Sequence, residues 1–98
     1  MMAKREAYIA SIKAQLDELN ISMTVMEAKV AASKEAMKEQ YAKEIQKLYV
    51  QSQQVRDKLD EIKSASENNW ESMINTTEKV RDAFVNSCHY FKAQLKED

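Results

Sequence analysis

The stretch Ser64-Ala65-Ser66-Glu67-Asn68-Asn69 decides the fold of this 98-residue chain, because it holds the clearest signals for a turn. Its short polar side chains compete with helical hydrogen bonds for the backbone. Ser64 and Glu67 have the spacing of a capping box. Ser66 and Asn68 are alternative N-caps for a following helix. We therefore predict the main break of the chain at residues 64–69.

The residues on both sides of this break follow a helical period. Before it, apolar residues recur in steps of three and four, as in the heptads of a coiled coil. This seam consists of Ile9, Ile12, Leu16, Leu19, Met23, Met26, Val30, Ser33, Met37, Tyr41, Ile45, Leu48, Ser52, Val55, Leu59 and Ile62. After the break, the seam consists of Trp70, Met73, Thr77, Val80, Phe84, Cys88, Phe91 and Leu95. The pattern predicts an all-α protein with a single domain over residues 1–98.

A second candidate turn lies at Ala31-Ala32-Ser33-Lys34. It would divide the chain into three similar helices, as in a three-helix bundle. Alanine, lysine and glutamate around it are strong helix formers, and the seam keeps its phase from Val30 to Met37. We therefore predict a long antiparallel helical hairpin or coiled coil, with one helix over about 4–63 and a shorter one over about 68–96. The three-helix bundle with an extra turn near 31–34 is the alternative.

The unequal lengths of the two predicted helices leave apolar surface uncovered. A short helix covers only half of a long one, so the remaining seam needs a second chain, and a dimer is the commonest solution. We expect the oligomer interface to consist of Ile12, Leu16, Leu19, Met23, Met26 and Val30. We expect the two helices of the hairpin to pack through Leu48, Val55, Leu59, Ile62, Trp70, Met73, Val80 and Phe84.

The composition excludes several classes of protein. The chain has no glycine and no proline, one cysteine and one histidine. Without glycine there is no phosphate-cradling loop or nucleotide-binding fingerprint. One cysteine excludes an intramolecular disulfide, and one histidine excludes a two-histidine zinc motif. With 15 basic and 16 acidic residues in alternation, the chain lacks the basic stripe of a nucleic-acid-binding protein.

The sequence also bears on location. No stretch approaches the roughly 18 apolar residues that a membrane span requires. The N-terminal segment Met1-Met2-Ala3-Lys4-Arg5-Glu6 is not followed by a long apolar region, so we expect no secretory signal. A single cysteine suits a reducing compartment. We expect a cytoplasmic protein, for which a membrane surface is a weaker candidate partner than another protein.

Cys88-His89-Tyr90 is the only cluster of chemically reactive side chains. Neighbouring residues on a helix diverge by about 100°, so Cys88 and His89 cannot act together on one metal ion or as nucleophile and base. We expect Cys88 to be a small buried apolar residue and His89 to face solvent, with a metal site shared between two chains as the alternative. Helical rods offer no cleft for paired catalytic carboxylates. We therefore predict no enzymatic activity, no cofactor and no metal site within the chain.

Four segments carry a resemblance to known proteins, the most specific being the serine-rich turn followed by Trp70. The segments are Lys4–Ile9, Lys13–Asn20, Ser64–Glu71 and Val80–Phe84. They resemble small bacterial coiled-coil proteins, many of which are described as stress-response proteins without known activity. The resemblance implies a coiled-coil fold and a stress-related role in a bacterial cytosol or at the envelope, and it implies no catalytic residue.

Two functions agree with these observations. The first is a non-enzymatic structural or interaction protein that self-associates through the heptad seam and presents its sides to a protein partner. The alternative is an amphipathic helical protein that binds reversibly to a lipid or another hydrophobic surface. The apolar stripe is narrow and lacks basic rims, which favours the first function.

Overall fold

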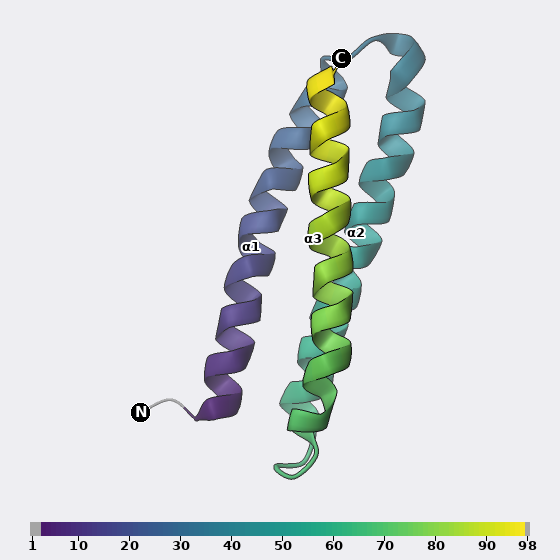
Figure 1. Ribbon diagram of the computed structural model, residues 1–98. Helices are drawn as coiled ribbons and strands as arrows, with labels where there is room; N and C mark the ends of the chain where they lie inside the picture. The colour runs from purple at the N-terminus through teal and green to yellow at the C-terminus, as the bar shows by residue number, and fades with distance from the viewer. Residues whose placement is uncertain (1–2, 98) are drawn as a thin grey trace.

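The computed structural model describes residues 3–97, which form a bundle of three long helices. Helix α1 spans Lys4–Ala31, α2 spans Glu35–Ser64 and α3 spans Ile74–Glu97. A 3-10 helix, η1 (Trp70–Met73), leads directly into α3. The helices run up, down and up beside one another, and the bundle measures 52 × 22 × 17 Å (Figure 1). Met1 and Met2, which begin the segment considered for a secretory signal, lie outside the described residues.

The structure confirms the all-α class and has the arrangement that was the alternative, a three-helix bundle with a turn near 31–34. The single helix predicted over 4–63 is wrong, because α1 ends at Ala31 and α2 begins at Glu35. The two parts of that predicted helix pack antiparallel, so the chain folds back twice and the bundle is 52 Å long.

The first turn forms without any special residue. Ala32 keeps a helical backbone (φ −90°, ψ −3°), and Lys34 is extended (φ −63°, ψ 141°). The hydroxyl of Ser33 donates a hydrogen bond to the carbonyl oxygen of Val30 at 2.6 Å, which satisfies one of the last carbonyls of α1. No described residue has a positive φ, so glycine is not needed here. Helix propensity differs by only a few tenths of a kcal/mol per residue, and burial of the α1 seam outweighs it.

The second turn lies at the predicted break. Helix α2 ends at Ser64, and η1 begins at Trp70, whose N–H donates to the carbonyl oxygen of Ser66 at 3.2 Å. The predicted capping box does not form: Ser64 is still the last residue of α2, and Glu67 forms an ion pair with Arg5. The last helix therefore begins with a 3-10 turn at Trp70 rather than as an α-helix at residue 68.

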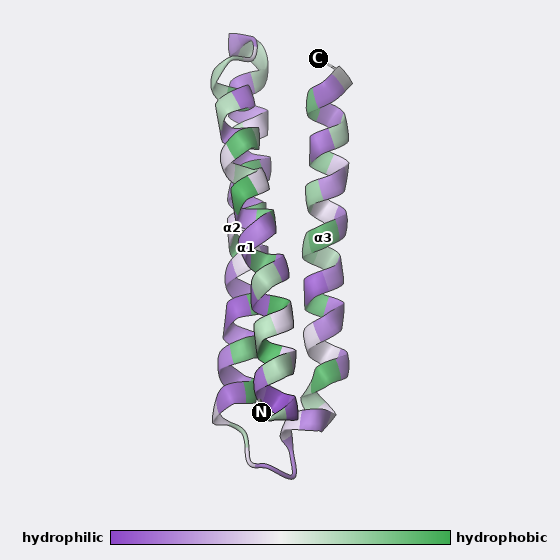
Figure 2. Cartoon of the chain, turned by 90° about the vertical axis from the view of Figure 1, so that its left-hand side faces the viewer, coloured by the Kyte–Doolittle hydropathy of each residue, from purple (hydrophilic) through white to green (hydrophobic). Residues whose placement is uncertain are grey.

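The core lies between the three helices, where their seams meet. Figure 2 shows apolar and polar segments alternating along each helix, as the period of about 3.6 residues requires. One cluster of buried side chains joins all three helices: Ile12, Leu16, Met23, Met26, Tyr41, Ile45, Leu48, Val55, Leu59, Phe84, Cys88 and Phe91. The rings of Tyr41 and Phe91 meet edge to face, with their centroids 5.6 Å apart. Helix α3 thus covers the seam of both other helices.

The residues predicted to form an oligomer interface are part of this core. Ile12, Leu16, Met23 and Met26 are at most 4% exposed, and Leu19 and Val30 are partly buried against the same cluster. The prediction that these six side chains form an interface with a second chain is therefore corrected. The turn at 32–34 divides the predicted long helix into α1 and α2, so α2 and α3 of the same chain cover these side chains.

The residues predicted to pack the hairpin lie inside the bundle as well. Leu48, Val55, Leu59 and Phe84 belong to the central cluster, and Val80 packs against it. Ile62 and Trp70 are buried towards the α2–η1 turn, and Met73 is half-buried. Their contacts now involve three helices rather than two.

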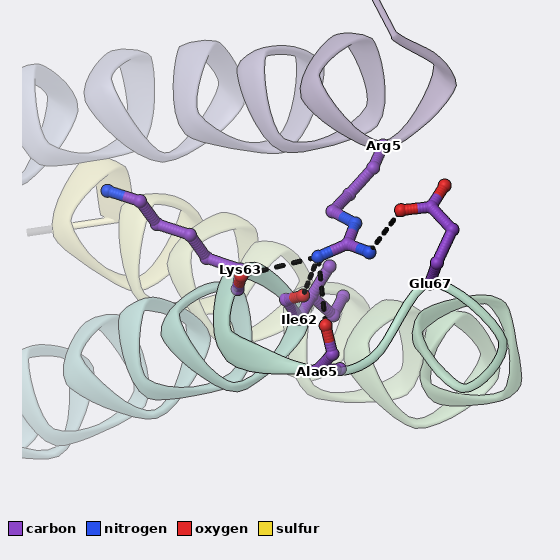
Figure 3. Close-up of polar contacts among 5 residues, drawn as sticks. All are labelled: Arg5, Ile62, Lys63, Ala65 and Glu67. Atoms are coloured by element: carbon purple, nitrogen blue, oxygen red, sulfur yellow. Dashed lines mark hydrogen bonds and ion pairs between the residues drawn. The ribbon is translucent and has the colours of Figure 1, made fainter.

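The side chain of Arg5 closes one end of the bundle (Figure 3). Its guanidinium lies 3.0 Å from the carbonyl oxygen of Ala65 and 3.3 Å from that of Lys63, and it pairs with the carboxylate of Glu67 at 2.7 Å. The same group lies 5.9 Å from the centroid of the Trp70 ring. The last carbonyls of a helix have no partner within the helix, so Arg5 of α1 caps α2 and holds the turn that leads into α3.

Replacing Arg5 with alanine is expected to lower the free energy of unfolding by about 1–3 kcal/mol, because hydrogen bonds from a charged donor are lost. The melting temperature of a domain of this size should fall by roughly 4–8 °C per kcal/mol, measured by circular dichroism. Lys4→Ala is the matched control, because its side chain is 79% exposed. Equal melting temperatures for the two variants would contradict this role of Arg5.

Candidate functional site

Three segments without Lys, Arg, Asp or Glu lie at the same height of the bundle: residues 19–26 of α1, 48–55 of α2 and 83–91 of α3. The hydroxyl of Ser52 donates to the side-chain oxygen of Asn20 at 3.1 Å, which aligns the first two segments. A groove lined by Leu19, Ser22, Cys88 and His89 aligns the first with the third. Together they form what we call the uncharged belt, which surrounds the middle of the bundle.

The uncharged belt contains all the large apolar side chains that the described residues expose. They are 45% to 67% exposed and comprise Ile21, Val25, Tyr49, Val50 and Tyr90. Monomeric proteins commonly expose single apolar residues, so the notable feature of these five is that all of them lie where charged residues are missing. The exposed apolar groups of this chain are thus gathered at one height rather than scattered.

Helix α1 is apolar on two opposite sides within the belt. Met23 and Met26 point into the core, whereas Ile21 and Val25 lie about half a turn away and are exposed. A helix that is apolar all round is typical of a buried position. The outer side of α1 is therefore the part of the bundle whose composition fits contact with another molecule best.

A shallow groove runs between α1 and α3. It consists of two adjoining hollows of about 320 and 470 Å³ that share Leu19, Ser22 and His89. Lys92 and Lys96 line one end of the groove, and Glu18 and Asp82 line the other. Within residues 3–97, no group of three or more His, Cys, Asp or Glu side chains is placed to hold a metal ion.

Cys88 lies at the floor of this groove and is 3% exposed. Burial raises the pKa of its thiol to about 11, so the thiol stays protonated near neutral pH and is a poor nucleophile. His89 is exposed and points away from the core, as its place next to Cys88 on the helix requires. Both side chains therefore line the groove, with Cys88 buried and His89 exposed to solvent.

The apolar seam does not include the exposed apolar groups of the belt. Their signal was present in the sequence as three segments of eight or nine residues without a charged side chain. Each segment is longer than two helical turns, so it has no charge on any face. That the three segments lie at one height depends on where the chain turns, which the seam did not reveal.

Comparison of the chain with protein-family models, with curated proteins and with solved structures finds no match. Within the described residues, no helix combines the length and the apolar character needed to cross a membrane.

The raised pKa of Cys88 predicts slow thiol chemistry in the folded state. Below pH 8.5, a disulfide reagent is expected to react with Cys88 at least about 100-fold more slowly in the native protein than in the guanidinium-unfolded protein. Similar rates in the two states would contradict the burial of this thiol.

The same pKa predicts a loss of stability at high pH. An unfolded thiol has a pKa of about 8.5, below that of the folded one, so deprotonation favours unfolding. The contribution of Cys88 should be complete below pH 8.5 and fall as the pH rises towards 11, measured by urea unfolding. Cys88→Ala should show a shallower decline, and an equal decline would contradict the assignment.

Proposed function

We propose that this protein is a non-enzymatic interaction protein that self-associates through the outer surface of its uncharged belt. The proposal rests on one observation: the large apolar side chains that the described residues expose all lie in the uncharged belt, namely Ile21, Val25, Tyr49, Val50 and Tyr90. The heptad seam supplies the fold of each chain, and the belt supplies the contact between chains.

The composition of the belt suits a protein interface. The central parts of interfaces are depleted in charged residues and enriched in aromatic residues, and their rims are polar. The belt has two exposed tyrosines, and Glu18, Glu27, Lys47, Arg56, Asp82 and Lys92 border it directly. Burying the belt therefore removes apolar surface from water without burying an unpaired charge, whereas the charged ends of the bundle stay solvated.

A lipid surface fits the structure less well. A helix that lies on a membrane needs an apolar face along its length with basic residues beside it. Here the seams of all three helices already cover one another, and the exposed apolar groups surround the middle of the bundle instead of following one helix. Self-association needs no opening of the core.

The site chemistry supports a role in binding rather than catalysis. Cys88 and His89 line one hollow, but the buried thiol of Cys88 has a raised pKa and is a poor nucleophile. We include in the proposal a cytoplasmic, stress-related setting, which the lone cysteine and the resemblance to bacterial coiled-coil proteins suggest, and a second protein as a further partner of the belt.

Self-association predicts that mass and stability depend on protein concentration. Sedimentation equilibrium between about 1 and 500 μM should show a shift from monomer to dimer, and the melting temperature should rise over the same range because association stabilises the folded form. A monomer mass throughout, with a constant melting temperature, would overturn the proposed function.

A further inference from the structure

One side of the bundle, which includes part of the belt, lies along the contact between α1 and α2. The hydrogen bond between Asn20 and Ser52 marks the flanks that the two helices turn towards each other. Beside it on α1, helical spacing places a stripe of exposed residues: Asp17, Ile21, Thr24 and Ala28. Beside it on α2, the corresponding stripe is Ala42, Gln46, Tyr49 and Gln53. We call these two stripes together the α1/α2 face.

The parts of the two stripes that lie towards the 32–34 turn are uncharged. Ile21 and Tyr49 supply large apolar groups, and Ala28 and Ala42 are small enough for another helix to approach closely. Side chains of this kind allow helices to pack at 8–10 Å between their axes. This half of the face can be covered by a second apolar surface without leaving a buried charge.

Towards the α2–η1 turn, helical spacing continues the two stripes into exposed charged residues, Lys13 on α1 and Arg56 and Asp60 on α2, which we include in the α1/α2 face. Counted from the Asn20–Ser52 contact at about 1.5 Å per residue, Asp17 on α1 lies near the height of Arg56 on α2. Lys13 on α1 likewise lies near the height of Asp60 on α2. At each height, one helix carries the opposite charge to the other.

These four charged side chains are exposed, and none takes part in the ion pairs found among the described residues. A two-fold axis parallel to the helices preserves height and places α1 of one copy against α2 of the other. Asp17 then faces Arg56 of the second copy, Lys13 faces Asp60, and the uncharged halves meet. An axis across the helices would instead bury the charged half of each copy against the uncharged half of the other.

We propose that a second copy of this chain docks on the α1/α2 face with its α1 against α2 of the first, around a two-fold axis parallel to the helices. The four central helices then alternate in direction, as in an antiparallel four-helix bundle. A face of a bundle 52 Å long and 22 Å wide exceeds the roughly 800 Å² per partner that a standard stable interface buries. This inference rests on the proposed self-association and specifies its surface and orientation.

A charge-exchange experiment tests the orientation. Asp17→Arg places two arginines opposite each other at both symmetric contacts, and Arg56→Asp places two aspartates there. Each single variant is expected to raise the dimer dissociation constant at least about 10-fold in sedimentation equilibrium at low salt. The double variant Asp17→Arg/Arg56→Asp restores opposite charges and should return to within about 3-fold of the unmodified chain. Lys79→Asp, on an exposed position of α3, is the control and should have no effect.

A second pair of variants tests the surface. Tyr49→Lys should abolish the dimer, whereas Asn75→Lys, which charges an exposed residue of α3 outside the belt, should leave it intact. Circular dichroism melts at low protein concentration are expected to show that each variant still folds.

The outcomes separate this inference from the proposed function. A dimer that tolerates Tyr49→Lys would overturn the α1/α2 face and leave self-association standing. A dimer that depends on Tyr49 but whose double charge variant stays weak would overturn the parallel two-fold axis. A wild-type chain that is monomeric at all concentrations, or that stays monomeric and floats with anionic phospholipid vesicles, would overturn both proposals.

Discussion

Mutual burial of three apolar seams is the constraint on which the rest of the structure depends. A single heptad seam on two helices leaves much of its apolar surface in water, and a chain of this length has little stability to spare. Phe84, Cys88 and Phe91 of α3 fill the space that α1 and α2 leave between them. The position of both turns, the length of the bundle and the height at which the three uncharged segments meet all follow from that packing.

The sequence predicted those parts of the fold that depend on local chemistry and period. The helical class, the break at 64–69 and the buried positions follow from the steps of three and four and from the short polar residues around Ser66. The turn at Ser33 did not, because Ala31, Ala32 and Lys34 are good helix formers and the seam keeps its phase through Met37. The Ser33 N–H and hydroxyl both donate to the carbonyl oxygen of Val30 at the end of α1. The turn brings the α1 and α2 seams together against α3, a contact between residues far apart in the sequence that local patterns do not predict.

The wrong prediction of one helix over 4–63 also led to the wrong prediction of the contact between chains. One long helix would leave the seam from Ile12 to Val30 exposed, so that it would need a second molecule to bury it. In the three-helix bundle, the same side chains pack into the core of the chain. The apolar seam predicts only the buried face of α1 and contains no information about its exposed side. Absence of charge over more than two turns, as in residues 19–26, is a second signal, and it carries information about the outer surface that the apolar period does not contain.

An odd number of helices gives the bundle a direction. The start of α1 and the end of α3 lie at opposite ends of a body 52 Å long (Figure 1), unlike the two ends of a hairpin, which lie together. Two proteins fused to the two ends of the bundle would be separated by its full length, with the uncharged belt between them. Two copies related by an axis along the bundle would point the same way, so the pair would present two like ends to one neighbour and two like ends to another.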